Sequence, residues 1–341
     1  MNNQSVPTLE DVAQLAGVST ATVSRCMNAP ERVKKHTRER VMSAVRDLGY
    51  FPNFGARALM AKHTNTIGAI IPTMENAVFA RGIQAFQEAL REMGITLFIS
   101  CSSYQEDLEE EQIRTLTARG ADGLLLIGHH RNEDIYRFLA NRDVPVLCTW
   151  VYDAAHPRIS IGFDNKNAMK ELAKVVISKG HRSIGVISAA QESNDRALNR
   201  VIGIREAMNE AGLAADALQL IETPYGIDNG SQALQELMSS NKPPTVVMCG
   251  NDVLATGALQ GAKKMGLRVP GDISITGFDD IELAALAEPG LTTVHVPHRE
   301  MGKRAAQMLM DMVKGTPPEQ SVELRTTVCI RGSLGAPSSA Q

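Results

Sequence analysis

The first apolar pattern of the chain has helical spacing. In TLEDVAQLAG, residues 8–17, three apolar residues can share one face of a helix: Val12, Leu15 and Ala16. Thr8 is a favourable N-cap residue, and Asp11 stands three positions later as a short-armed capping-box acid. Gly17 can end the helix because glycine readily adopts a left-handed backbone. A short helix between Thr8 and Gly17 is therefore predicted.

Two more helices are predicted directly after it. Ser19 can cap TATVSRCMN, residues 20–28, in which Ala21, Val23 and Met27 can face inward. Polar residues then face outward: Thr20, Thr22, Ser24, Arg25 and Asn28. A third helix contains RERVMSAVRDLGY, residues 38–50, and its apolar stripe is Val41, Ala44, Val45 and Leu48. The three-residue turn between the first two helices contains glycine, which is typical of a helix-turn-helix.

From residue 66 onward, short apolar strands alternate with amphipathic helices. The strands of the first half are TIGAIIP, ITLFISC, ADGLLLIG and PVLCTW. The alternation starts again at SIGVISA, residues 183–189, and continues through TVVMCGND to ISITGFDD. Such alternation predicts parallel sheets with helices on both faces, in two similar halves. Ligands of these sheets bind beyond the carboxyl ends of the strands.

The positions after the predicted strands are unusually polar. In the first half they include Thr73, Phe79, His129, His130 and Asp164. In the second half they include Arg196, Arg200, Tyr225, Asn251, Asp252, Asp279 and Asp280. Carboxylates and amides can accept sugar hydroxyls, guanidinium groups bind anions, and aromatic faces stack on rings. Each residue taken singly fits ordinary surface-loop chemistry, but the set predicts a polar small-molecule cleft between two lobes.

Charge divides the chain where the pattern changes. Residues 1–62 carry nine Lys and Arg against five Asp and Glu, a net charge of +4, so the rest of the chain carries −7. A basic head on an acidic body indicates that the head alone meets a polyanion. Its second helix can then present Thr20, Ala21 and Arg25 to base edges in the major groove, while other polar residues reach phosphates: Ser19, Thr22, Ser24 and Asn28. The alternative is that the head is a small helical bundle that binds another protein or has no binding partner.

Other classes of protein have little support in the sequence. It contains no GxSxG, GxxxxGK[ST] or HExxH motif, and no GxGxxG follows a strand, so we expect no enzyme, no cofactor and no metal. His129 and His130 are adjacent and lack a third ligand at useful spacing. Five scattered cysteines fit reduced, buried thiols. No apolar run approaches a membrane span and the N-terminus has no signal pattern, so a cytoplasmic protein is expected.

The residues of the head carry a family resemblance. TLEDVAQLAGVSTATVSRCMN followed by RERVMSAVRDLGYFPNFGARALMAK resembles the headpiece and hinge of the LacI/GalR transcriptional repressors. The resemblance implies that residues 53–62 fold into a hinge helix on operator DNA, with Asn53 as its cap and Leu59 wedged into the minor groove, and it adds Thr8 to the DNA-binding residues. Gly55 weakens such a helix by roughly 1 kcal/mol relative to alanine. Lys34 also departs from the family, which usually has a serine there.

The resemblance extends over nearly the whole chain. The segments that carry it are FDN, RSIGVIS, Arg196 to Gly203, GNDVLATGAL, GLRVPGDISITGFDD and LTTVHVP. It implies a core similar to periplasmic sugar-binding proteins, with an N-lobe of residues 63–162 plus 293–322 and a C-lobe of residues 163–292 plus 323–341, after a headpiece of residues 1–52. By this match four residues are ligand contacts, Asp164, Arg200, Asn251 and Asp279, and Tyr225 is the stacking aromatic. The expected fold class is thus α/β, a helix-turn-helix headpiece plus two doubly wound parallel-sheet lobes.

The expected effector is a sugar acid. Arg196 and Arg200 lie one helical turn apart, with His129 across the cleft, and two cations favour a carboxylate. IGFDN and ISKGHRSIG most resemble the gluconate-repressor branch of the family, which points to gluconate or a keto-gluconate. Arg196 can instead pair with Asp195 or Glu192, which leaves a neutral sugar or a nucleoside as the alternative. Further alternatives are a sugar-binding protein without a DNA role and a co-repressor that binds an aglycone or a phosphoprotein partner.

A homodimer on palindromic operator DNA is expected. One helix-turn-helix makes too few contacts for tight specific binding, and a two-fold dimer reads two half-sites. The helix after Glu75 is the candidate for the N-lobe seam, through four residues: Val78, Phe79, Gly82 and Ile83. The tail RGSLGAPSSAQ has no leucine heptads, so a helical tetramerisation arm is not predicted.

Overall fold

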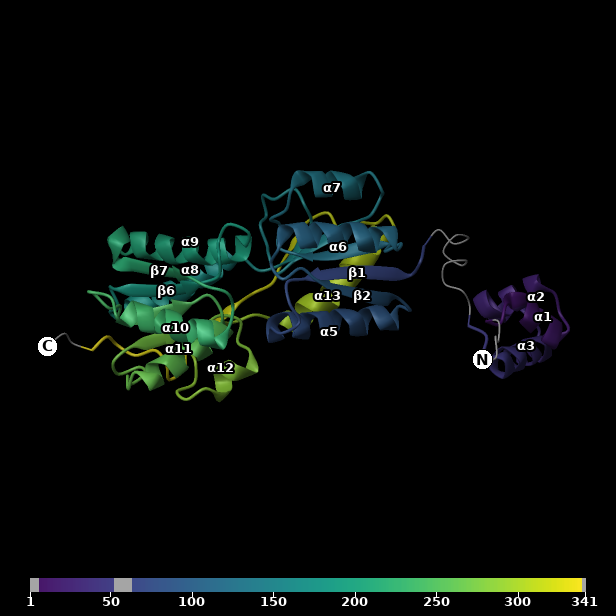
Figure 1. Cartoon of the computed structure of the whole chain (residues 1–341). Coiled ribbons are helices and arrows are strands. Elements are labelled where there is room, and N and C mark those ends of the chain that lie inside the picture. Colours follow the sequence, from purple (N-terminus) through teal and green to yellow (C-terminus); the bar gives the residue numbers. More distant parts are fainter. Residues whose placement is uncertain (1–5, 52–62, 339–341) are drawn as a thin grey trace. The chain divides into compact units, whose positions relative to one another are not determined.

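The computed structural model describes residues 6–51 and 63–338, which belong to two compact units, Met1–Thr64 and Asn65–Gln341. The first unit, the headpiece, holds three helices, α1 (Leu9–Ala16), α2 (Thr20–Asn28) and α3 (Lys35–Leu48), with a 3-10 turn at Pro30–Arg32 (Figure 1). The predicted hinge residues Asn53 and Leu59 lie outside the described residues.

Local capping explains where the headpiece helices begin and end. The backbone N–H of Thr8 donates to the Asp11 carboxylate (2.7 Å), and Asp11 N–H donates to the Thr8 hydroxyl (3.3 Å). Ser19 accepts from Thr22 N–H at the start of α2. Gly17 and Gly49 end α1 and α3 with φ of 60° and 62°. The predicted capping box, N-cap and glycine stops are confirmed.

The headpiece core differs from the predicted apolar faces at two positions. Its buried residues are Val12, Ala13, Ala16, Val23, Cys26, Val41 and Ala44. Leu15, expected inside, is 56% exposed, and Ala21 is also exposed. Because α1 packs on both α2 and α3, its buried stripe turns toward Ala13, and the buried side of α2 is formed by Val23 and Cys26. These two expectations were wrong.

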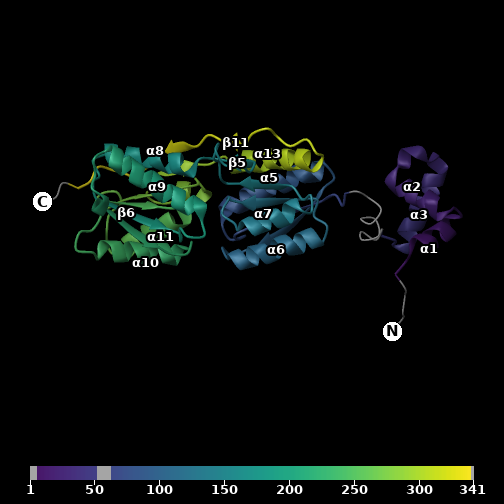
Figure 2. The same cartoon turned by 90° about the horizontal axis from the view of Figure 1, so that it is seen from above.

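The N-lobe contains a parallel sheet of six strands in the order β11-β5-β4-β3-β1-β2. Its strands are β1 (Thr66–Ile71), β2 (Thr96–Cys101), β3 (Gly123–Ile127), β4 (Val146–Thr149), β5 (Ser160–Gly162) and β11 (Val322–Glu323). Helices α5 (Ala77–Glu92) and α13 (His298–Val313) cover one face, and α6 (Glu106–Ala118) and α7 (Glu133–Ala140) cover the other (Figure 2). The fully buried β1 explains why its sequence is continuously apolar.

The C-lobe contains a parallel sheet of four strands in the order β7-β6-β8-β9. These strands are β6 (Ile184–Ser188), β7 (Leu218–Glu222), β8 (Val246–Cys249) and β9 (Ser274–Thr276). The helices α8 (Asn165–Ser178) and α9 (Asp195–Glu210) pack on one face, α10 (Ile227–Met238) and α11 (Asp252–Lys264) pack on the other, and the short α12 (Glu282–Leu286) follows β9. A 3-10 turn, Ala215–Ala217, precedes β7. The predicted α/β fold with parallel sheets is confirmed.

Three segments connect the lobes. The chain leaves the N-lobe after β5, returns into α13, and leaves again between β11 and β12 (Thr327–Cys329). β10 (Thr293–His295) pairs antiparallel with β12. Parallel bridges link Thr292, just before β10, to Thr276 and link His295 to Asp279 of the C-lobe. Residues 293–295 therefore lie with the C-lobe and not, as expected, with the N-lobe, because their backbone pairs with C-lobe strands.

The predicted dimer seam on α5 lies inside the N-lobe. Val78, Phe79 and Ile83 are each at most 5% exposed. A Cβ on Gly82 would lie 2.5 Å from the Trp150 ring, and one on Gly302 of α13 would lie 2.0 Å from the Gly82 carbonyl oxygen. This face of α5 is filled by α13 and Trp150 of the same chain, so it cannot form the seam between two copies.

Candidate functional site

The exposed face of α2 is the candidate DNA-binding surface. Val23 and Cys26 fix the buried side of the helix, so Ser19, Thr20, Ala21 and Arg25 are left exposed. Thr22 and Ser24 are half-buried, and Thr8 is exposed at the start of α1. The exposure of these residues agrees with the prediction that they face DNA, and the side chain of Asn28 lies outside the described part of the chain.

Several of the predicted DNA contacts, among them Thr8, Ser19 and Thr22, already have intramolecular partners. The Thr8 hydroxyl donates to the Asp11 carboxylate (2.7 Å), and the Ser19 hydroxyl lies 3.0 Å from that of Thr22. The capping role therefore accounts for Thr8 and Ser19 without DNA. The α2 N-terminus still offers backbone N–H groups, and Arg25 a guanidinium, to an anionic partner.

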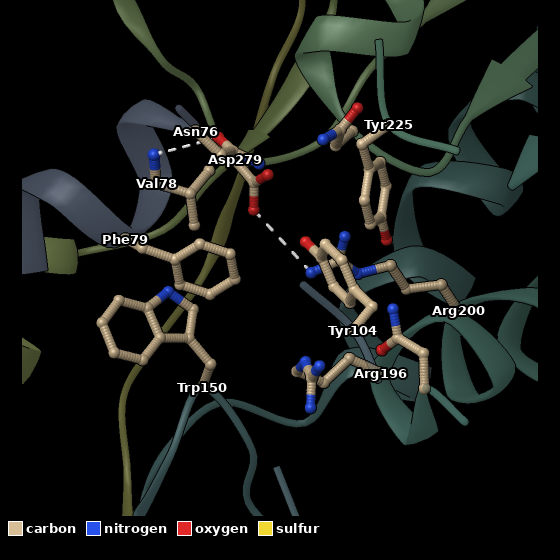
Figure 3. A pocket seen from close by; sticks show the side chains of 11 residues that line it. Asn76, Val78, Phe79, Tyr104, Trp150, Arg196, Arg200, Tyr225 and Asp279 are labelled. Atoms are coloured by element: carbon tan, nitrogen blue, oxygen red, sulfur yellow. Dashed lines mark hydrogen bonds and ion pairs between the residues drawn. The ribbon is translucent and has the colours of Figure 1, made fainter. Parts of the chain in front are cut away.

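A second candidate site is a cavity between the two lobes (Figure 3). It encloses about 320 Å³, a volume that includes its open mouth. Its lining comes from both lobes: Asn76, Val78, Phe79, Tyr104, Trp150, Asn194, Arg196, Arg200, Tyr225, Asn251 and Asp279. An apolar wall with a few convergent polar groups is typical of a ligand site.

Asp279 is the most unusual residue of the cavity. It follows β9, is 2% exposed, and holds a φ of 106°, a conformation that costs energy for a residue other than glycine. Among the described residues, its Oδ1 has no hydrogen-bond partner, and it lies 3.7 Å from Nη2 of Arg200. Burial raises the pKa of this carboxyl to about 7, although the charge of Arg200 opposes the rise. A buried oxygen without a donor is suited to accept one from a ligand.

Arg200 is held rigidly beside Asp279. Its Nε donates to Asn165 Oδ1 (2.9 Å), its Nη1 donates to the Gly250 carbonyl (2.5 Å), and its guanidinium lies 3.9 Å from the centre of the Phe278 ring. Only Nη2 is then directed toward Asp279 and the cavity (Figure 3). One N–H group can therefore be offered to a ligand without reorganisation.

Arg196 reaches the cavity from the start of α9. Its Nη1 donates to Asp195 Oδ1 (2.8 Å) and to the carbonyl of Ile127 (3.2 Å). The pairing with Asp195, left open by the sequence, is thus present, and it neutralises much of the charge of Arg196. Of the two expected cations, Arg200 is the one whose free N–H faces a carboxylate.

Aromatic residues form two walls of the cavity. Phe79 and Trp150 meet edge to face, with ring centres 5.4 Å apart, and Tyr104 and Tyr225 lie 5.6 Å apart. Figure 3 shows the first pair across the cavity from Tyr104. Burial raises the pKa of both tyrosines, so their hydroxyls stay protonated and can donate hydrogen bonds. A ring-shaped ligand can stack here while its polar edge meets Asp279 and Arg200.

The structure brings together six of the nine predicted effector residues: Phe79, Arg196, Arg200, Tyr225, Asn251 and Asp279. The other three do not line the cavity. Thr73 accepts from Glu75 N–H in the turn before α5, and Asp164 caps α8 through Asn167 N–H. His129 stacks on His156, with ring centres 3.7 Å apart. Local turn, cap and ring contacts account for these three side chains, and their contact with an effector stays a prediction.

Five lining residues were missed by the sequence reasoning: Asn76, Val78, Tyr104, Trp150 and Asn194. The rule that ligands bind after strands could have found Trp150, which directly follows β4, and Tyr104, which follows β2. Asn76 and Asn194 begin helices as N-caps. Their sequence signal is that of a cap, which many helices without any ligand share.

In residues 6–51 and 63–338 no group of three or more His, Cys, Asp or Glu side chains is placed to hold a metal ion. Among the helices described, none is long and apolar enough to cross a membrane.

An exposed helix-turn-helix followed by a two-lobed core with a cavity defines a ligand-responsive DNA-binding regulator. Residues 8–53 match the profile described as "Bacterial regulatory proteins, lacI family", and residues 173–334 match that of a "Periplasmic binding protein-like domain". HTH-type transcriptional repressor PurR of Aliivibrio salmonicida is 34% identical over 331 residues, which cover 96% of this chain and 98% of that protein. The chain belongs to the LacI family of bacterial transcriptional regulators.

Solved structures agree with this assignment. The Lac repressor dimer bound to operator and the anti-inducer ONPF is similar with a TM-score of 0.86 and 25% identity, covering 97% of this chain and 100% of that one. The transcriptional regulator CelR in complex with cellobiose is similar with a TM-score of 0.70 and 28% identity, covering 96% and 99%. The predicted family and its DNA-binding role are thereby confirmed.

Proposed function

We propose that this protein is a repressor that binds palindromic operator DNA as a homodimer in the cytoplasm and releases or tightens that binding when a small molecule enters the cavity. The exposed face of α2 supports direct reading of the major groove through Thr20, Ala21 and Arg25. The two-fold symmetry follows from the short footprint of one helix-turn-helix. The solved Lac repressor relative is described as a dimer on operator.

The effector we propose is a hydroxylated small acid, with gluconate or a keto-gluconate first, so the controlled operon would serve carbohydrate breakdown. The observation that carries this proposal is the buried Asp279 oxygen without a donor, placed 3.7 Å from Nη2 of Arg200. Hydroxyl groups can donate to Asp279 while a carboxylate accepts from Arg200 and Arg196. The aromatic walls then cover the carbon chain.

A neutral sugar is the second candidate, for a specific reason. Asp195 already neutralises Arg196, and Asp279 lies against Arg200, so the cavity holds two cation–carboxylate pairs rather than two free cations. Such a balance suits a ligand with hydroxyls alone. The CelR relative was solved as a complex with cellobiose. A nucleoside, stacked between the aromatic walls, is the third ligand to be tested.

Thermal melting of the full chain separates these ligands. Gluconate, glucose, cellobiose and adenosine are each added at millimolar concentration, and a ligand that binds the native state raises the melting temperature by mass action. We expect gluconate to give the largest rise. The Arg200→Ala variant should lose that rise relative to its own melting curve, whereas Arg205→Ala, an exposed arginine on the same helix, should keep it. If only neutral sugars raise the melting temperature, the proposal of an acidic effector is wrong.

The DNA side of the proposal has its own test. The full chain is used to select fragments from random DNA, and binding to the recovered sequence is titrated with and without the ligand found above. Arg25→Ala should weaken binding to the selected site by roughly tenfold or more, because a bidentate base contact is worth about 1–3 kcal/mol. Arg46→Ala, an exposed arginine of α3, is the matched control. Recovery of no palindrome would contradict the proposed dimer.

A further inference from the structure

Asp195 joins the two lobes at the rim of the cavity. It is the first residue of α9 in the C-lobe, and its Oδ2 accepts the backbone N–H of His129 (2.6 Å) and of His130 (3.2 Å). Both N–H groups belong to the N-lobe loop that follows β3. Charge-assisted hydrogen bonds of this kind are shorter and stronger than neutral ones. One side chain thus holds the backbone of the opposite lobe.

The same carboxylate positions Arg196 against the cavity. Asp195 Oδ1 accepts from Arg196 Nη1 (2.8 Å), which also donates across the lobes to the Ile127 carbonyl (3.2 Å). Burial tends to raise the pKa of Asp195, but the charge of Arg196 and the His129 N–H outweigh it and lower the pKa. Asp195 is therefore charged at neutral pH, and its two oxygens serve both contacts.

The N-lobe loop is shaped to receive this contact. Gly128 has a φ of 75°, which favours glycine. A Cβ at this position would lie 1.9 Å from Nη1 of Arg196 and 2.5 Å from Oδ1 of Asp195. Both the conformation and the close approach require glycine, so the two sides of the contact fit each other.

We propose that Asp195 is a latch that holds the two lobes closed over the cavity and a positioning residue for Arg196 on its wall. The inference deepens the proposed function, since it takes the cavity as the effector site. Lobe closure and the geometry of Arg196 depend on one carboxylate, so a ligand that touches Arg196 acts directly on the latch. Such a contact is a physical route by which occupancy of the cavity biases the lobe arrangement.

A second contact between the lobes lies elsewhere and is weaker. Arg81 of α5 forms an ion pair with Glu282 of α12, but the Glu282 side chain is 65% exposed. The Asp195 side chain is only 16% exposed. Exposed ion pairs are screened by water and contribute little, so this ion pair holds the lobes together less strongly than the Asp195 contacts do.

Trp150 supplies a probe that needs neither effector nor operator. It is the only tryptophan of the chain, is 2% exposed, and lines the cavity from the N-lobe. When the lobes separate, water and acrylamide reach its indole, so its emission shifts to longer wavelength and its quenching constant rises. The measurement is made on the full chain, with far-UV circular dichroism to verify the fold.

Two variants remove the latch from opposite lobes. Asp195→Asn removes the charge but leaves α9 capped by Asn194, whose Oδ1 accepts from Ala197 N–H. Gly128→Ala blocks the approach from the N-lobe side. Since a hydrogen bond to a charged group is worth roughly a factor of ten or more, each variant should lower the closed-to-open ratio about tenfold. Red-shifted emission and a larger quenching constant are expected in both variants, with unchanged circular dichroism.

Each variant has a matched control. Asp228→Asn removes an exposed aspartate from the first turn of α10 in the same lobe. Gly94→Ala introduces the same backbone strain, at a φ of 74°, where a Cβ meets nothing within 4 Å. Glu282→Gln tests the weaker contact. The controls should keep the spectrum of the unaltered chain, and Glu282→Gln should change it less than Asp195→Asn.

The outcomes decide the proposal independently of the effector. The latch is supported if Trp150 emission and quenching change in both latch variants and stay unchanged in Gly94→Ala and Asp228→Asn. This holds even if gluconate fails to bind. Unchanged emission and quenching in Asp195→Asn and Gly128→Ala overturn it, as does a shift in only one of them or an equal shift in the controls. Failure of every sugar in the melting assay would instead count against the proposed effector alone.

Discussion

Two residues of the cavity wall are held in conformations that stability alone would not favour. Asp279 has a φ of 106° and Trp150 has a φ of 59°, although neither is glycine. Asp279 is buried with an unpartnered oxygen, and Trp150 Nε1 is also buried without a partner in the described residues. Strain and unsatisfied polar atoms gather where a protein has been shaped for binding. Both residues line the same cavity.

The pKa of Asp279 predicts a pH-dependent stability. The folded carboxyl has a pKa of about 7, above its ordinary 3.8, so between these values the native state binds a proton that the unfolded chain does not. Raising the pH through this window lowers the free energy of unfolding. The Asp279→Asn variant has no carboxyl at this position and so does not lose this stability as the pH rises. Its melting temperature should be higher than that of the unaltered chain at about pH 8, and the difference in melting temperature should shrink toward about pH 4.

Calorimetric melting curves across that pH range measure the effect. Asp228→Asn, an exposed aspartate of α10, should show no such trend. A stability difference that grows toward acid pH would contradict the assigned direction of the Asp279 pKa shift. The same Asp279→Asn variant should bind the effector more weakly, because the amide offers one oxygen where the carboxylate offers two.

At the scale of elements, the sequence correctly predicted the features that contacts between neighbouring residues determine. The Thr8–Asp11 box, the Ser19 cap and the stops at Gly17 and Gly49 depend on contacts within a few positions, and each was predicted correctly. The alternation of strands and helices likewise predicted the parallel sheets correctly. Such signals are local and do not depend on which element packs where.

The predicted side-chain positions were wrong where packing between elements distant in the sequence determines them. Leu15 is exposed because α3 turns the buried stripe of α1 toward Ala13. The α5 seam failed because α13, more than 200 residues later, covers that face. His129 was expected in the cavity, but Asp195 binds its backbone and His156 stacks on its ring. None of these partners is adjacent in sequence, so spacing alone carries no signal for them.

The capping box of α1 predicts local stability in the headpiece. Thr8→Ala removes the acceptor of the Asp11 N–H, and the loss of an N-cap costs about 1 kcal/mol. Hydrogen exchange of the α1 amides in the full chain should therefore speed up by roughly fivefold. Thr37→Ala, in α3, is the matched substitution, and its α1 amides should exchange as before. Equal exchange in both variants would show that the box contributes nothing.

The contact of α5 with α13 predicts a severe packing defect. A Cβ at Gly302 would lie 2.0 Å from the carbonyl oxygen of Gly82, and backbone cannot move aside as a side chain can. Gly302→Ala should lower the stability of the core by at least about 1–3 kcal/mol, the usual range for overpacking. Lys303→Ala, at the exposed next position, should be nearly neutral. Urea unfolding followed by circular dichroism distinguishes them.

The whole molecule separates its two tasks by charge. Residues 1–62 carry +4 and the remainder −7, and the compact units divide at residue 64. Polyanionic DNA attracts the first and repels the second. Residues 65–341 alone should therefore keep the effector affinity of the full chain within about twofold and lose operator binding, whereas the full chain should bind operator with an affinity that falls steeply as salt rises.

Calorimetric titration with effector and fluorescence anisotropy with operator DNA measure these two affinities on both proteins. If counterion release drives binding, a plot of log affinity against log salt is linear, and its slope reports the number of phosphates neutralised. If Arg25 contacts a phosphate, Arg25→Ala should reduce that slope by about one. If Arg25 contacts a base, the variant should leave the slope unchanged and weaken binding to one DNA sequence selectively. Operator binding by residues 65–341, or a salt-independent affinity of the full chain, would contradict the assignment of DNA recognition to the basic headpiece.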